Sequence, residues 1–292
     1  MEHHIKNDFL RISVKQTGAE LSCIESVRSG LSYLWNGDAT FWPNHSPVLF
    51  PIVGGLKNNS YFYKGQSFSL PRHGFIRGNT NITLTAQTEN SLTFGLVADE
   101  ASLMVYPFQF EFSITYTLFA NRLVVSHLVK NTGDEDMFFS LGAHPAFACP
   151  LHAAERYEDY YLEFDKPETD STWVLSAEGL VTEESKPTLH NTNVLHLSRT
   201  LFDHDALIFK NLKSRQVSLR STKSQQVLTV QFDDFPYLGL WAKPNAPFVC
   251  IEPWLGIADS VETNQDIETK EGILCLKSKH HYSAAYTISI SE

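Results

Sequence analysis

The sequence has few cysteines, and they lie far apart. Cys23, Cys149, Cys250 and Cys275 form no Cys-x-x-Cys pair, so their spacing matches neither a zinc site nor a thioredoxin-like redox motif. A chain of 292 residues can rely on a hydrophobic core and does not need disulfide bonds to hold its fold.

Positive charge is also scarce. The chain has 23 lysines and arginines against 33 aspartates and glutamates, which gives a formal net charge of −10. Broad binding to nucleic acid or to an anionic membrane needs a basic surface, so we expect neither partner. The same balance still allows a small anionic substrate that is held by one or two local arginines.

Long hydrophobic runs are missing too. No apolar run approaches the ~18–20 residues that a membrane-spanning helix requires. The first ten residues, MEHHIKNDFL, lack the basic and then apolar pattern of a signal peptide. We therefore expect a soluble cytoplasmic protein, and both a monomer and a homodimer stay open.

Several common catalytic motifs are absent. The sequence contains no Gly-x-Ser-x-Gly, His-Glu-x-x-His, Gly-x-Gly-x-x-Gly or P-loop motif, so nothing local supports hydride transfer, zinc proteolysis or nucleotide hydrolysis. Two histidines and a carboxylate could bind a metal, but none of them has the spacing of metal ligands, and we expect no metal site.

The dominant hydrophobic period is two, which is typical of strands that are buried on one face. The segment NITLTAQTENSLTFGLVAD predicts two strands around a Glu-Asn-Ser turn, and Asn36-Gly37, Lys64-Gly65 and Thr132-Gly133 predict further turns. In FQFEFSITYTLF the apolar side chains that share one face are Phe108, Phe110, Phe112, Ile114, Tyr116 and Leu118.

Evidence for helices is thin. Residues 264–273, NQDIETKEGI, predict about two helical turns that end at Gly272. The polar stretch 152–196 predicts long excursions over one end of a sheet. With 42% apolar residues, no repeat and no linker, the chain predicts one all-β domain over residues 1–292, a large antiparallel β-sandwich.

Three segments carry the candidate chemistry. Arg72, His73 and Arg77 lie in LPRHGFIRGN, His144 lies in LGAHPAF, and Glu252 lies in VCIEPWLGIADS. Each segment places a titratable residue where an apolar strand meets a loop with proline or glycine, a common location for functional groups. Taken singly, each residue could equally be structural.

One further histidine and three aromatic residues also bear on the site. His127, in LVVSHLVKN, is expected on the polar face of its strand. Trp254, beside Glu252, could offer a flat aromatic face to a ligand. Phe75 and Phe147, in the other two candidate segments, could do the same or belong to the core.

Together the three segments resemble motifs of the aldose 1-epimerase (galactose mutarotase-like) superfamily. PRHGFIR is similar to its His-Gly-Phe-Ala-Arg motif, GAHPAF to Gly-Gly-His-Pro-Ala-Phe, and IEPWLGIAD to Glu-Pro-Trp-x-Gly-x-x-Asp. The order also agrees, and the greatest similarity is to the LacX-like branch, which is near the hexose-6-phosphate mutarotases.

The resemblance implies a galactose mutarotase-like supersandwich with a sugar-binding groove and no metal or organic cofactor. It implies that His144 protonates the ring oxygen of the sugar and that Glu252 takes the proton from the anomeric hydroxyl. His73 would help to position the ring oxygen. Asp205 would bind sugar hydroxyls, although Asp203 is only two residues away.

One departure from the family pattern concerns the substrate. The family usually carries an arginine in a Gly-Arg stretch ahead of the first histidine motif. Here PIVGGLKNN offers only Gly55 and Lys57. Arg77 could supply the missing contact, or it could hold a phosphate as in the hexose-6-phosphate branch.

The residue types suit the interconversion of α and β anomers. Opening the hemiacetal needs a proton removed from the C1 hydroxyl and another delivered to the ring oxygen, and each transfer contributes about 10²–10⁴-fold. The favoured hypothesis is therefore a mutarotase that acts on a free or phosphorylated hexose. A sugar-binding or sensing protein without catalysis is the alternative hypothesis. A carbohydrate-processing accessory domain is a third and weaker hypothesis.

Overall fold

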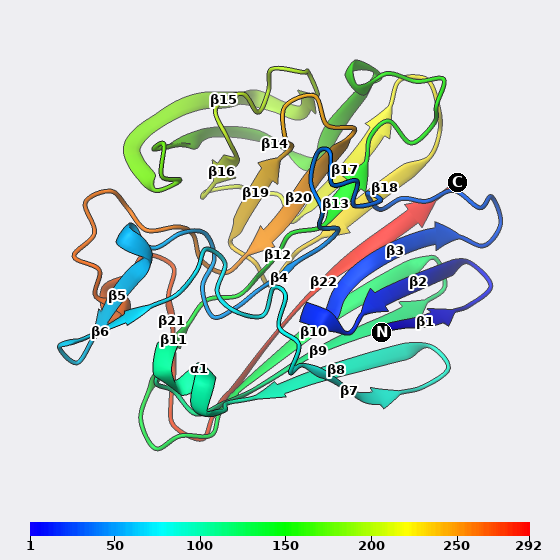
Figure 1. The fold of residues 1–292 in the computed structure, drawn as a ribbon. Coiled ribbons are helices and arrows are strands. Elements are labelled where there is room, and N and C mark those ends of the chain that lie inside the picture. Colours follow the sequence, from blue (N-terminus) through cyan, green and yellow to red (C-terminus); the bar gives the residue numbers. More distant parts are fainter.

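The computed structural model describes residues 1–292, and β-strands dominate it (Figure 1). Fifteen strands pair antiparallel in one large sheet, in which β13 pairs with β20 and β15 with β14 outside the main order β4-β12-β20-β19-β16-β14-β17-β18-β22-β10-β9-β8-β7. Their bounds are β4 Val48–Leu49, β7 Thr83–Gln87, β8 Ser91–Val97, β9 Phe110–Phe119, β10 Arg122–Asn131, β12 Gly142–Ala143, β13 Ala146–Ala148, β14 Tyr160–Leu175, β15 Val181–His196, β16 Leu207–Phe209, β17 Gln216–Ser221, β18 Val227–Gln231, β19 Tyr237–Trp241, β20 Phe248–Trp254 and β22 His281–Ser291.

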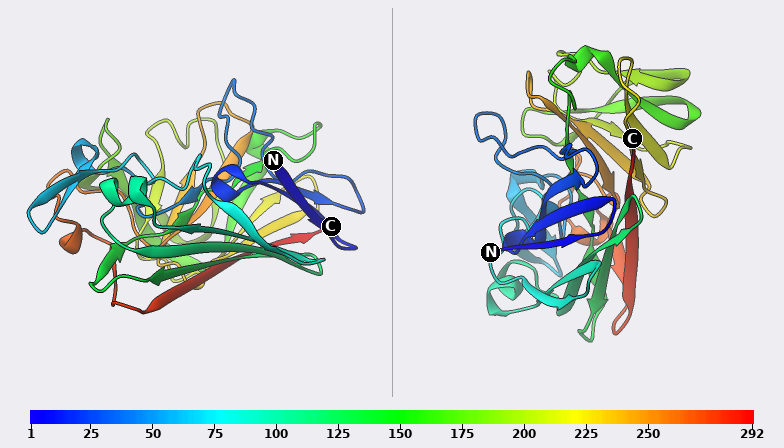
Figure 2. Two further views of the ribbon diagram at one scale, coloured as in Figure 1. Left: turned by 60° about the horizontal axis from the view of Figure 1, so that its bottom comes forward. Right: turned by 90° about the vertical axis from the view of Figure 1, so that its right-hand side faces the viewer.

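A second, three-stranded sheet lies across the part of the large sheet that contains β8, β9 and β10 (Figure 2). The Tyr116 hydroxyl joins the two layers by donating to the Ala19 carbonyl at 2.7 Å. The remaining elements are β1 Glu2–Lys6, β2 Leu10–Lys15 and β3 Glu20–Ser26 of this sheet, the pairs β5 Ser60–Tyr63 with β6 Gln66–Ser69 and β11 Met137–Phe139 with β21 Leu274–Leu276, the helix α1 Glu100–Val105, and 3-10 helices at Thr17–Ala19, Lys57–Asn59, Tyr157–Asp159 and Ile267–Thr269.

The period of two in the sequence determines which side chains are buried. Along β9, buried and partly exposed residues alternate from Phe110 to Leu118, as strand geometry requires. The main core is one cluster of 71 buried apolar residues, with members from Ile5 to Ile290. The predicted all-β, antiparallel fold is confirmed.

The turns are also where their residues predict them. β7 and β8 flank the Glu-Asn-Ser turn. Lys64 and Gly65 join β5 to β6 with φ values of 49° and 77°, and two consecutive positive φ values are what a two-residue type I′ hairpin turn needs.

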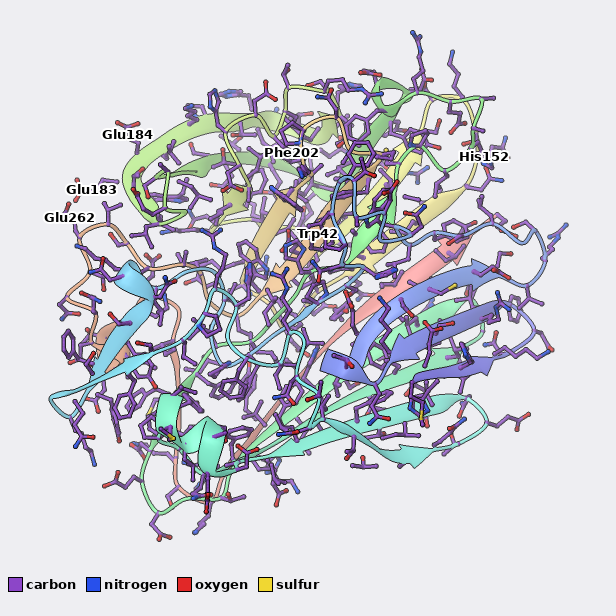
Figure 3. All side chains as sticks on the ribbon, in the orientation of Figure 1. Trp42, His152, Glu183, Glu184, Phe202 and Glu262 are labelled. Atoms are coloured by element: carbon purple, nitrogen blue, oxygen red, sulfur yellow. The ribbon has the colours of Figure 1, made fainter.

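The prediction for residues 152–196 was wrong in its secondary structure. Instead of irregular excursions, this stretch contains β14 and β15, two strands of 16 residues each that form a long curved hairpin (Figure 1). Half of the residues of β15 are exposed, and Glu183 and Glu184 point outward from it (Figure 3). A strand with solvent on both faces shows little hydrophobic alternation, so the sequence pattern does not reveal it.

The predicted helix over residues 264–273 is only the 3-10 helix Ile267–Thr269. Gln265 has a φ of 65°, which stops a helix from starting earlier, and Gly272 packs against Gly256. The α-helix of the fold is instead α1, where Asp99 and Ser102 form a capping box. No helix of the structure combines the length and apolar character needed to span a membrane.

His127 lies on the buried face of β10, so its expected position on the polar face was wrong. Only 2% of the residue is exposed. Its ring stacks near Tyr286 and lies close to Phe112 and Phe235. His127 lies on the same face of β10 as Val125 and Val129. Both faces of this strand carry apolar residues, so the sequence pattern could not show which face His127 occupies.

Candidate functional site

Glu252 lies on β20, a fully buried strand of the large sheet. All seven residues of β20 are buried, and Glu252 is 1% exposed. The Trp254 indole, two residues further on the same face, covers Gly239 of β19 and Gly142 of β12. An added Cβ would lie 2.5 Å from the indole at Gly239 and 2.7 Å from it at Gly142. These two glycines give the indole its place beside the carboxylate.

His144 lies in the short connection between β12 and β13. Its backbone N–H donates to the Pro47 carbonyl at 3.2 Å, and the residue is 9% exposed. The imidazole Nδ1 is 3.4 Å from Glu252 Oε2. Because β12 and β13 both pair with β20, the sheet itself brings the imidazole to the carboxylate.

His73 comes from the loop between β6 and β7, with a φ of 69°. Its ring centroid is 5.6 Å from that of His144. The Gly54 backbone N–H donates to His73 Nδ1 at 3.1 Å. Because Nδ1 accepts a hydrogen bond, the neutral ring carries its proton on Nε2 and can donate from that atom. Burial and the neighbouring His144 lower the pKa of His73 well below its usual range, so the ring is neutral.

The three residues share a cavity of about 270 Å³, close to the range of small-molecule sites. Segments far apart in the sequence meet here, from the loop before β4 to the loop after β20. The sequence-predicted residues that line the cavity are His73, Arg77, His144, Asp205, Glu252 and Trp254. A larger groove of about 500 Å³ lies over β7–β10, but its lining has no histidine and no buried acid-base pair.

The cavity perturbs both members of the central pair. Burial, together with the nearby Asp205 carboxylate, raises the pKa of Glu252 well above its usual range. Burial, together with the Arg77 guanidinium, lowers the pKa of His144 to about 3. Desolvation penalises the charged form of each group, so the empty site favours a protonated carboxyl beside a neutral imidazole.

Three buried polar atoms of the cavity make no hydrogen bond within the protein. They are His144 Nδ1, Glu252 Oε2 and Trp254 Nε1. Buried polar atoms are nearly always hydrogen-bonded, and an unsatisfied one costs free energy. A ligand with several hydroxyl groups could supply the missing partners.

Lys57 is not brought to the cavity. Its Nζ donates to the Val261 carbonyl at 2.7 Å, so the ammonium group is engaged elsewhere. Arg77 and Arg72, in contrast, both line the cavity. Arg77 forms no hydrogen bond or ion pair within the protein, whereas Arg72 Nη2 donates to the Glu178 carbonyl at 2.8 Å.

Asp205, rather than Asp203, faces the cavity. Asp205 adopts a φ of 77° just before β16, and its carboxylate accepts from the Ala206 N–H at 2.8 Å. Phe147 is fully buried and Phe75 packs on the core. Neither phenylalanine lines the cavity, so Trp254 is the predicted aromatic residue that does.

Sequence reasoning missed two aromatic residues. Trp42 stacks on His144 with ring centroids 4.9 Å apart, and Trp241 contacts the edge of the same imidazole at 5.6 Å. Figure 3 shows Trp42 near β19 and β20. Trp42 could have been noticed as a large aromatic residue next to a proline in FWPN. This segment lies outside every predicted strand, so burial in a sheet does not account for the tryptophan.

One group of potential metal ligands overlaps the site. His144, Cys250 and Glu252 each offer an atom within 4.8 Å of the other two. However, burial raises the pKa of the Cys250 thiol well above its usual range, and metals bind the thiolate. Cys250 also does not line the cavity. We assign this cluster no metal.

Comparisons with known proteins identify the family of the chain. The family model described as aldose 1-epimerase matches residues 1–273. The chain belongs to the aldose 1-epimerase family. It is 39% identical over 299 aligned residues to the LacX protein of Lactococcus lactis subsp. lactis, in both its plasmid and chromosomal forms, with 99% of each chain covered. The family resemblance of the three motifs is confirmed.

Solved structures extend the agreement to the fold. A galactose mutarotase related enzyme from Lactobacillus acidophilus is 34% identical, with a TM-score of 0.95 and coverage of 100% of this chain and 98% of the other. A galactose mutarotase-like protein from Lactobacillus casei is 27% identical, with a TM-score of 0.93 and full coverage of both chains. Membership of this epimerase family supports a mutarotase-like, sugar-binding function for the protein.

Proposed function

We propose that this protein is an aldose 1-epimerase that interconverts the α and β anomers of a hexose or hexose phosphate. The observation that carries the proposal is the buried pair of His144 and Glu252, 3.4 Å apart at one cavity. A carboxylate and an imidazole at this distance can act on the two oxygens bonded to one anomeric carbon. A site that only binds sugar has no need for such a matched acid and base.

The proton balance of the pair fits the reaction. Ring opening gives one proton to the ring oxygen and takes one from the anomeric hydroxyl, so the site ends with the number of protons it started with. Before opening, His144 holds the proton and Glu252 is ionised. After opening, Glu252 holds it and His144 is neutral. The pKa directions of the empty site favour this second pattern, and ring closure on the other face restores the first.

The neighbouring groups have supporting roles in this proposal. His73, with its proton on Nε2, donates toward the ring oxygen and holds it near His144. The Asp205 carboxylate accepts from sugar hydroxyls, and the Trp254 indole covers the C–H face of the sugar. Trp42 and Trp241 fix the plane of the His144 ring from two sides, which limits the imidazole to productive orientations.

The two arginines support a phosphorylated sugar as substrate. Arg72 and Arg77 line both the catalytic cavity and a second, neighbouring cavity of about 490 Å³ that has no hydrophobic residue in its lining. Lys15 adds a third positive charge there, and Glu20 is its one acidic residue. Guanidinium groups bind phosphate in a bidentate manner, and Arg77 is free to do so.

Anomer exchange measured by saturation-transfer NMR at neutral pH tests the proposal. Glucose, galactose and their 6-phosphates are compared in the presence of a chelator. We expect the wild-type protein to accelerate exchange of the 6-phosphates more than that of the free sugars. His144→Asn should remove most of the acceleration while sugar binding is retained.

Each outcome has a defined meaning. Faster exchange of free sugars alone would support the epimerase activity and show that the substrate is not phosphorylated. Sugar binding without any acceleration of anomer exchange would overturn the proposed epimerase activity and favour a sugar sensor. A rate that depends on metal, and is lost with the chelator, would contradict the proposed acid-base chemistry.

A further inference from the structure

A buried ion pair lies just outside the cavity. Lys270 Nζ is 2.9 Å from Asp259 Oδ1, and their side chains are 4% and 2% exposed. Neither residue lines the cavity. Lys270 Nζ also donates to the Ile257 carbonyl at 2.8 Å. A charge pair this deeply buried is costly to desolvate, so its position next to the site calls for a role.

Asp259 connects three segments that surround the cavity. Its carboxylate Oδ2 accepts from the Lys57 backbone N–H at 2.9 Å, and its own N–H donates to the Gly55 carbonyl at 2.9 Å. Its carbonyl accepts from the Val181 N–H at 2.8 Å, at the start of β15. The residue itself follows β20, which carries Glu252. One side chain and its backbone thus hold the loop 54–57, the hairpin and the catalytic strand together.

The loop 54–57 is the segment that orients His73. The Gly54 N–H donates to His73 Nδ1 at 3.1 Å, and the Gly54 carbonyl accepts from the His73 N–H at 2.8 Å. Gly54 also packs tightly on Ala258, where an added Cβ would lie 2.5 Å away. A shift of this loop would remove the hydrogen bond that fixes the ring and its tautomer.

We propose that Asp259, held by Lys270, is a positioning residue that keeps His73 in its productive orientation through the loop 54–57. The inference rests on the proposed function only for the role of His73. The chain of contacts runs from Lys270 to Asp259, then through the Lys57 and Gly55 backbone to Gly54, and ends at His73 Nδ1. An apolar pair could fill the same volume, but it could not accept from the Lys57 N–H.

The test combines kinetics with ¹⁵N NMR of labelled histidine. In the wild-type protein, His73 Nδ1 is an unprotonated acceptor and Nε2 is protonated. Asp259→Ala should move the Nδ1 resonance as the Gly54 hydrogen bond is lost. It should also lower kcat by about 10- to 100-fold, as expected for a misplaced group, with little change in KM. Asp259→Asn keeps an acceptor for the Lys57 N–H. It should therefore recover part of the wild-type Nδ1 resonance position and part of kcat.

A matched control separates positioning from stability. Val230→Ala leaves a small void in β18, a fully buried position outside the cavity lining, and should destabilise the fold without changing the His73 resonance or kcat. The proposal is overturned if Asp259→Ala behaves as this control does. Should Asp259→Ala fail to fold, Lys270→Met is judged by the same two readouts. The NMR signal needs no turnover, so an inactive wild-type protein would overturn the proposed function and leave this test intact.

Discussion

The substitution Glu252→Gln separates the chemical role of this carboxylate from its structural one. Glutamine has nearly the same shape and cannot act as a base at neutral pH. If Glu252 takes the proton from the anomeric hydroxyl, the rate of anomer exchange should fall by about 10²–10⁴-fold. At about 1.4 kcal/mol for each factor of ten, this equals about 3–5 kcal/mol of barrier.

The same variant should not lose stability. Because burial and Asp205 raise the pKa of Glu252 in the folded state, the unfolded chain releases this proton at lower pH than the folded one. The wild-type protein therefore loses stability as pH rises above the usual carboxyl range. Glutamine mimics the neutral carboxyl and avoids this loss. The free energy of unfolding of the variant, relative to wild type, should increase with pH above about 4.5.

Two assays decide the matter, namely saturation-transfer NMR for exchange and urea unfolding between pH 4 and 8. The control is Glu183→Gln, the same change at an exposed position on β15, which should alter neither measurement. Wild-type exchange in Glu252→Gln would refute the base assignment. A lower stability than wild type at pH 8 would refute the argument that the buried carboxyl is neutral in the empty site.

Three further predictions concern separate parts of the molecule. Burial lowers the pKa of His127 to about 4, so this histidine should by itself contribute a loss of about 3 kcal/mol in the free energy of unfolding as pH falls from 6.5 to 4. Urea unfolding of His127→Leu should show a correspondingly smaller loss than wild type. In Gly239→Ala the added methyl group would press on the Trp254 indole. This variant should lose about 1–3 kcal/mol of stability and should bind sugar more weakly in calorimetry. The control is Gly55→Ala, where the nearest contact of the added methyl group is 3.8 Å away. Arg77→Met should raise KM for a hexose 6-phosphate by about tenfold and leave that for the free hexose unchanged.

Candidate residues were readable from sequence where they sit in short motifs. His73, His144 and Glu252 each lie in a compact segment with proline or glycine, because a side chain held at a strand end needs a stiff local backbone. Asp205 was readable only as one of two aspartates, since no local pattern distinguishes it from Asp203. Trp42 was missed because its loop has no regular period.

The elements that the sequence did not reveal depend on distant partners. The hairpin of β14 and β15 is polar because much of it extends into solvent. The predicted helix near residue 267 is shortened to a 3-10 turn whose flanking residues bind distant partners: Gln265 donates a hydrogen bond to Ser60, and Lys270 forms an ion pair with Asp259. Lys57 looked like a substrate ligand, but its ammonium group is taken by the Val261 carbonyl, 204 positions along the chain.

The sequence by itself determined the antiparallel β architecture and the choice of candidate site residues. Both depend on local features, namely the period of two and the motif segments around His73, His144 and Glu252. The tertiary structure alone decided the 3.4 Å contact of the acid-base pair, the tautomer of His73 and the choice of Arg77 over Lys57. These depend on which strands become neighbours and how deeply each group is buried, because desolvation and hydrogen bonding act through space and not along the chain.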